Sequence, residues 1–187
     1  MNRYVLLLVG PIILSGALLG FDHHSGLAYQ RGAVQAGEYW RLLSAHWVHL
    51  NGWHWLFNVA AWPLICLLAG TGIATRHWLF ACLWCCFGVS AGLWVSGVVW
   101  YVGLSGVLHG LLVVALSACR ERWLAGLVGF GLLAKLVWEQ MTGMQTNAWI
   151  EHPVLVDVHL YGAGSGLLYL TMVFGWRRYL VRYRGSV

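Results

Sequence analysis

Charged side chains are scarce in this sequence. Lysine, arginine, aspartate and glutamate together make up 9% of its 187 residues, and 60% of the residues are hydrophobic. Soluble domains carry roughly 25% charged residues, so this composition excludes an ordinary soluble domain. None of the four residue types occurs between residues 77 and 119. The expected fold class is therefore an all-α polytopic membrane protein.

The sequence also lacks a linker or a low-complexity segment, which indicates one domain over residues 1–187. A helix needs about 20 residues to cross a bilayer, so the chain has room for about six spans. Residues 77–119 are too long a segment for one crossing and are expected to divide near residues 96–103. The expected helices are residues 4–21, 53–70, 77–95, 105–119, 123–138 and 158–176, with an outer loop at residues 22–52.

Basic residues are few on one side of this arrangement. Eight of the eleven lysines and arginines lie at the N-terminus, in the second and fourth connections, or in the C-terminal tail: Arg3, Arg76, Arg120, Arg122, Arg177, Arg178, Arg182 and Arg184. Most acidic residues lie on or near the opposite side. The positive-inside rule then places both termini in the cytoplasm. The net charge of +5 follows from this topology and does not indicate nucleic-acid binding.

Metal-binding patterns are incomplete in this chain. Cys82-x-x-Cys85-Cys86 has no partner cluster, so these cysteines are expected to be small apolar packing residues. His46 and His49 have chelating spacing, but no carboxylate or cysteine completes a site in the sequence. We therefore expect no metal.

Haem ligation by histidines on different helices is a further alternative, and it would require His109 or His159 to face another histidine at the same depth. We expect no cofactor.

The outer loop contains a candidate interfacial segment. Residues 38–49 suit an amphipathic helix with Trp40 and Trp47 at headgroup level. His54 and Asn58 follow at i, i+4 on one helix face near the outer membrane surface. Two donors pointing into the bundle are what an oxyanion hole requires. The alternative is that they form hydrogen bonds between helices.

Ser105 lies in the segment Gly103-Leu104-Ser105-Gly106, where an apolar loop must become a helix. The flanking glycines allow strained angles or close backbone approach. A helix from Ser105 to residue 119 spans only about 22 Å, so Ser105 should lie below the outer surface. Non-helical backbone at that depth must be buried in protein or line a watery cavity. The pattern predicts an intramembrane nucleophile; the alternative is a helix-packing patch.

Two small-residue ladders, Gly106-x-x-x-Gly110 and Gly162-x-x-x-Gly166, should bring their helices close together. His159 lies one turn outward of Gly162, at the depth of Ser105. The expected result is a Ser–His dyad, with His159 as general base and then general acid.

No acidic residue is obviously placed as a third member of this pair. Asp157 is expected in the preceding loop. Lys135 and Glu139, at i, i+4, are interpreted as an intramembrane ion pair, with a proton relay as the alternative.

Together these residues resemble the rhomboid intramembrane serine proteases. The matching motifs occur in order along nearly the whole chain: Trp40-Arg41, His49-x4-His54-x3-Asn58, Gly103-x-Ser105-Gly106 and His159-x-x-Gly162-x-x-x-Gly166. The resemblance implies a six-helix rhomboid-like bundle with Ser105 as nucleophile and His159 as base. It also implies an oxyanion hole made by His54, Asn58 and the Ser105 backbone N–H, with His49 supporting the loop.

His109 stands where many rhomboids carry a tyrosine under the catalytic imidazole. The chain looks more like the rhombosortase branch in three features: this histidine, the short six-helix arrangement and the segment His159-Leu-Tyr-Gly-Ala163. That resemblance implies a bacterial inner-membrane enzyme whose active site opens to the periplasm. Its partners would be the lipid bilayer and transmembrane substrates with Gly-Gly-containing C-terminal tails. The alternative is an inactive rhomboid-like protein that binds transmembrane helices.

Overall fold

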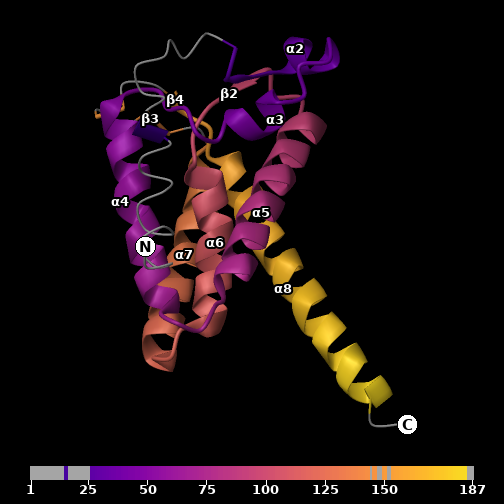
Figure 1. Ribbon diagram of the computed structural model, residues 1–187. Coiled ribbons are helices and arrows are strands. Elements are labelled where there is room, and N and C mark those ends of the chain that lie inside the picture. The colour runs from indigo at the N-terminus through magenta and orange to yellow at the C-terminus, as the bar shows by residue number, and fades with distance from the viewer. Residues whose placement is uncertain (1–14, 17–25, 144, 147–148, 151–152, 185–187) are drawn as a thin grey trace.

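The computed structural model describes residues 15–16, 26–143, 145–146, 149–150 and 153–184. The expected first helix at residues 4–21 lies outside the described residues except for 15–16, as does the start of the outer loop. The described chain is mostly helical (Figure 1). Among the described helices, α4 (Gly52–Ala69), α5 (Thr75–Val95) and α7 (Arg122–Thr142) are long and apolar enough to cross a membrane.

Two further helices complete the described bundle. The shorter apolar helix α6 (Ser105–Ala118) lies at its centre, packed against α4, α5 and α8 (Asp157–Arg184). Figure 1 shows α8 extending beyond the other helices at its C-terminal end. A small antiparallel pair, β3 (Gln145–Thr146) and β4 (Pro153–Val154), lies between α7 and α8 in the sequence.

Two expected helix ends are wrong in ways that matter for the site. The helix expected to stop at residue 138 continues to Thr142, so Glu139 lies within the last turn of α7. Asp157 was expected in a loop but begins α8, as its acidic residue in the first turn. An acidic side chain at a helix N-terminus is stabilised by the helix dipole, so the first turn of α8 suits Asp157.

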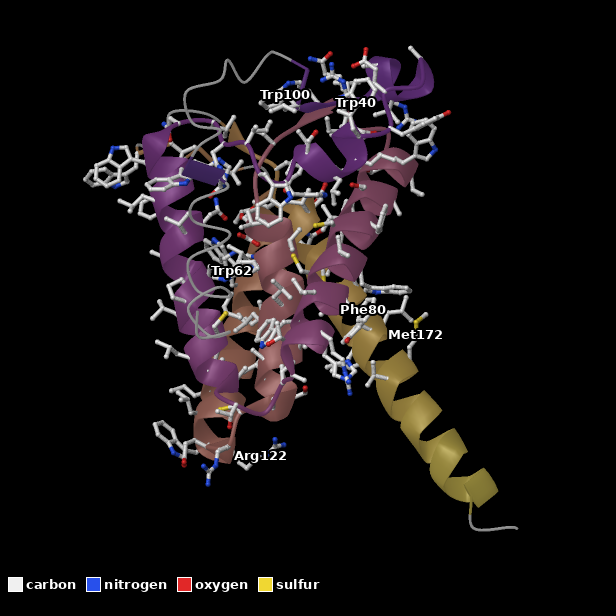
Figure 2. All side chains as sticks on the ribbon, viewed as in Figure 1. Trp40, Trp62, Phe80, Trp100, Arg122 and Met172 are labelled. Atoms are coloured by element: carbon white, nitrogen blue, oxygen red, sulfur yellow. The ribbon has the colours of Figure 1, made fainter. Side chains whose placement is uncertain are left out.

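Apolar side chains cover the outside of the bundle as well as its core. Phe80 and Met172 point outward in Figure 2 and are exposed, whereas Trp62 is buried within the bundle. Arg122 lies at the opposite end of the molecule from Trp40 and Trp100. An exposed apolar band of this kind fits a helix bundle surrounded by lipid.

The described part of the outer loop folds back over one end of the bundle. Strand β1 (Tyr29–Gln30) pairs antiparallel with β2 (Trp100–Tyr101), in a register that aligns Tyr29 with Tyr101. This pairing joins the loop to the segment that leads into α6. Two short helices, α2 (Arg31–Gln35) and α3 (Arg41–Ser44), follow β1.

The amphipathic helix expected over residues 38–49 is therefore wrong, since only the four residues of α3 are α-helical there. Inward polar contacts explain the difference. The Arg41 guanidinium is buried and donates to the Ala28 carbonyl at 2.7 Å, and it also pairs with Glu38. The Trp40 indole donates to the Gly26 carbonyl at 2.9 Å. The Arg41 side chain is thus turned into the protein and does not contribute to a polar face toward water.

Candidate active site

Ser105 is the first residue of α6, and two hydrogen bonds hold the turn before it. The Gly103 N–H donates to the Ala45 carbonyl at 2.9 Å, and the Tyr101 hydroxyl donates to the Gly103 carbonyl. Gly103 has φ of 125°, which side-chain-bearing residues rarely adopt. A Cβ there would also lie 2.6 Å from His54 Cε1. Gly103 is thus required both for its backbone angle and for space.

Tyr101 is buried, and burial raises the pKa of its phenol above the usual value. The hydroxyl therefore stays protonated and remains a donor to the Gly103 carbonyl. This contact fixes the last irregular turn before Ser105.

Ser105 and His159 come together across the contact between α6 and α8. His159 Nε2 lies 3.0 Å from Ser105 Oγ, and the His159 side chain is buried. The glycine ladders permit this approach. A Cβ on Gly106 would lie 2.8 Å from the Val158 carbonyl oxygen, and one on Gly162 would overlap the Gly106 carbonyl. The close approach of α6 and α8 that the ladders predicted is observed, and it brings the Ser105 and His159 side chains together.

Glu139 is a site residue whose contact with His159 the sequence analysis missed. Its Oε2 lies 2.9 Å from His159 Nδ1. The ion pair between Lys135 and Glu139 predicted from their spacing is present as well. Lys135 Nζ also lies 3.2 Å from His159 Nδ1. The available signal was an acidic residue at the same end of the bundle as Ser105, but the expected helix ended at residue 138, just before Glu139.

The His109 ring packs against the face of the His159 ring. The two imidazole rings stack with centroids 4.1 Å apart. His109 Nδ1 lies 2.7 Å from the Ser105 carbonyl oxygen and donates to it. A porphyrin plane does not fit between rings at this spacing, so the haem alternative for this histidine pair is wrong.

His54 and Asn58 line the same cavity as Ser105 and His159. The cavity has a volume of about 510 Å³. The Leu50 N–H donates to His54 Nδ1 at 3.3 Å, so a neutral His54 ring carries its proton on Nε2. Asn58 Nδ2 donates one N–H to the His54 carbonyl at 2.7 Å, and an amide nitrogen has a second N–H. The cavity is thus lined by an imidazole N–H of His54 and by the amide of Asn58.

The loop histidines pack inside the protein. His49 is 1% exposed, and its ring meets that of His54 edge-on with centroids 5.2 Å apart. His46 Nε2 lies 3.1 Å from the Cys86 carbonyl oxygen, and burial lowers the pKa of His46 to about 4. His46 is therefore neutral and joins the loop to α5.

No group of three or more potential ligands is arranged around a metal position in the part of the chain that the structure describes.

A comparison with family models identifies the class of protein. A model described as Rhomboid domain matches residues 36–176, which is more than half of the chain and includes every site residue described above. The chain therefore belongs to the rhomboid family, a family of intramembrane serine proteases that also has inactive members. Membership implies a multi-pass membrane protein whose substrates are embedded in the bilayer. The chain matches none of the curated protein sequences with which it was compared.

Proposed function

We propose that this protein is an intramembrane serine endopeptidase that cleaves the transmembrane segments of membrane-anchored proteins. The observation that carries the proposal is the 3.0 Å contact between His159 Nε2 and Ser105 Oγ. A serine hydroxyl is a weak nucleophile unless an adjacent base accepts its proton. The buried imidazole is placed to do so.

The proposed reaction has two steps. Ser105 Oγ attacks the scissile carbonyl carbon while its proton passes to His159 Nε2. His159 then returns the proton to the leaving amine, the peptide C–N bond breaks, and an acyl-enzyme remains. In the second step water attacks the ester carbonyl and gives a proton to His159. The ester C–O bond then breaks, and His159 returns that proton to Ser105 Oγ. Where the acyl group passes to another amine, that amine takes the place of water.

The negative charge on the substrate oxygen needs donors during both steps. We assign this role to His54 Nε2–H, to the second N–H of the Asn58 amide and to the Ser105 backbone N–H. The two side chains share the cavity with Ser105, and the N–H belongs to the first turn of α6, where helical N–H groups lack intrahelical partners. Pre-oriented donors of this kind are usually a large part of catalysis.

The cavity also suits an apolar substrate. Leu64, Ile65 and Leu108 contribute to its walls beside the polar groups. We propose a substrate span with Gly-Gly near its outer end, followed by a basic tail. Each glycine costs a helix about 1 kcal/mol relative to alanine, so such a span opens its backbone more easily to Ser105. The resemblance to rhombosortases supports this choice and a location in the bacterial inner membrane with the site facing the periplasm.

The test is a cleavage assay in proteoliposomes with a model transmembrane substrate. Wild-type protein should cleave it, while Ser105→Ala and His159→Ala should be inactive yet folded. Ser117→Ala is the matched control, because Ser117 lies near the other end of α6 and donates to the Val114 carbonyl. Cleavage by Ser105→Ala would overturn the proposal. Substrate binding without cleavage by the wild-type protein would instead identify an inactive rhomboid-like binder.

A further inference from the structure

His159 Nδ1 has two neighbours of opposite charge. Glu139 Oε2 lies 2.9 Å away and Lys135 Nζ lies 3.2 Å away. The two neighbours are also paired with each other, through Lys135 Nζ and Glu139 Oε1. All three groups lie at the end of the bundle where α6 and α8 begin and α7 ends.

These neighbours favour different tautomers of the imidazole. A carboxylate only accepts hydrogen bonds, so Glu139 requires a proton on Nδ1 and leaves the Nε2 lone pair facing Ser105. A lysine ammonium only donates, so bonding to Lys135 would require a bare Nδ1 and place the proton on Nε2. An Nε2–H cannot accept the Ser105 proton. The choice of partner at Nδ1 therefore determines whether His159 can act as a base.

We propose that Glu139 is the positioning residue that holds His159 in the Nδ1–H tautomer and stabilises the imidazolium formed when Ser105 gives up its proton. Lys135 neutralises the carboxylate through its bond to Oε1, and this bond competes with donation from the ammonium to Nδ1. This inference rests on the proposed function of Ser105 and His159. It replaces the expected dyad by a Ser–His–Glu arrangement with an associated lysine.

Burial supports this assignment. The Glu139 side chain is 9% exposed, and a carboxylate that is nearly buried is costly unless its oxygens have partners. Each oxygen has one: Oε1 bonds Lys135 and Oε2 bonds His159. The carboxylate is thus held from two sides, which fixes its direction toward the imidazole.

The remaining titratable groups near His159 contact atoms other than Nδ1. His109 stacks on the ring face and donates to the Ser105 carbonyl. Asp157, on the same helix as His159, accepts from Gln140 Nε2 at 3.4 Å. His54 lines the cavity from α4 and accepts from the Leu50 N–H. Among the described residues, Glu139 is the acidic side chain that the structure bonds to Nδ1.

The test separates the charge of Glu139 from its shape. In proteoliposomes, Glu139→Gln should lower kcat by on the order of 10² or more, as loss of the orienting acid does in other serine proteases, with KM near the wild-type value. Glu139→Asp keeps the charge on a shorter side chain and should recover part of kcat. Glu121→Gln, the same change just before the far end of α7, is the matched control and should behave as wild type.

A second comparison uses the competing donor. Without the carboxylate, Lys135 is free to bond Nδ1 and hold the wrong tautomer. The double variant Lys135→Met, Glu139→Gln should therefore have a higher kcat than Glu139→Gln, measured on protein of equal folded content. In a His159→Ala background, Glu139→Gln should cause no further loss, because groups that act as a unit are not additive.

Each outcome bears on one of the two proposals. Wild-type kcat in Glu139→Gln would overturn the role of Glu139, and so would equal kcat in Glu139→Gln and Glu139→Asp. In either case an inactive His159→Ala would still uphold the proposed function. An active His159→Ala would overturn the proposed function itself. If Glu139→Gln does not fold, the double variant carries the same test, since it leaves no unpaired charge. Wild-type kcat in that variant overturns the inference.

Discussion

The imidazole ring of His109 lies almost parallel to that of His159, with ring centroids 4.1 Å apart and an interplanar angle of 19°. His109 is anchored to the Ser105 carbonyl through Nδ1, so one side chain contacts both members of the proposed catalytic pair. The stack limits rotation of the His159 ring about its Cβ–Cγ bond. It therefore helps to keep Nε2 directed at Ser105.

The first prediction concerns this stack. His109→Tyr should retain activity, because a tyrosine ring offers the same flat surface and is the residue that many rhomboids carry there. His109→Ala should lower kcat by on the order of 10², since small misplacements of a catalytic group cost this much. The measurement is kcat in proteoliposomes for both variants. Equal activity of His109→Ala and wild type would show that the stack has no catalytic role.

The second prediction concerns the proposed oxyanion donors. Loss of one donor typically lowers kcat by about 10²–10³, so His54→Ala and Asn58→Ala should each be strongly impaired without being inactive. Thermal unfolding must be measured alongside, because His54 also packs against Gly103 and His49. Wild-type turnover by the double variant would show that these side chains only connect parts of the fold.

The third prediction concerns the ladder between α6 and α8. Gly162→Ala should destabilise the fold and abolish cleavage, since its methyl group would overlap the Gly106 carbonyl. Gly164→Ala, on the same helix, has nothing within 4 Å of its new methyl group. It should stabilise the helix by roughly 0.5–1 kcal/mol and leave activity unchanged. Comparable unfolding temperatures for the two variants in detergent would contradict the close helix contact.

The sequence was most informative where spacing alone determines which side chains meet. The ladders Gly106-x-x-x-Gly110 and Gly162-x-x-x-Gly166 predicted close packing, and α6 and α8 do pack against each other through these glycines. The pairing of Lys135 with Glu139 followed from their i, i+4 spacing on one helix. In both cases the spacing was informative because the geometry of a helix fixes which residues share a face.

Contacts made by the irregular outer loop and by the end of α7 were not predictable in this way. The outer loop pairs its β1 strand with the segment before α6, and its arginine and tryptophan bond to backbone carbonyls earlier in the loop. Nothing in the spacing of residues 38–49 indicated these contacts. The bond between Glu139 and His159 depended in the same way on how far α7 continues and how it lies against α8.

The fourth prediction concerns substrate choice. Replacing Gly-Gly by Leu-Leu at the outer end of a candidate tail should block its processing, because the leucines stabilise the helix and shield its backbone. Changes in the basic cluster that follows should affect membrane orientation more than cleavage. The measurement is mass spectrometry of the released product, with a Gly-Gly pair moved to the middle of the span as the control. Efficient cleavage of a glycine-free, leucine-rich span at the same depth would leave only a general rhomboid specificity.

Covalent labelling tests the central claim, activation of Ser105 by His159, most directly. A fluorophosphonate reacts with an activated serine hydroxyl, and peptide mass spectrometry identifies the modified residue. We expect one adduct, at Ser105, in the folded wild-type protein, and none after heat denaturation or in His159→Ala. An adduct at another serine, or equal labelling of Ser105 in wild type and His159→Ala, would contradict the account.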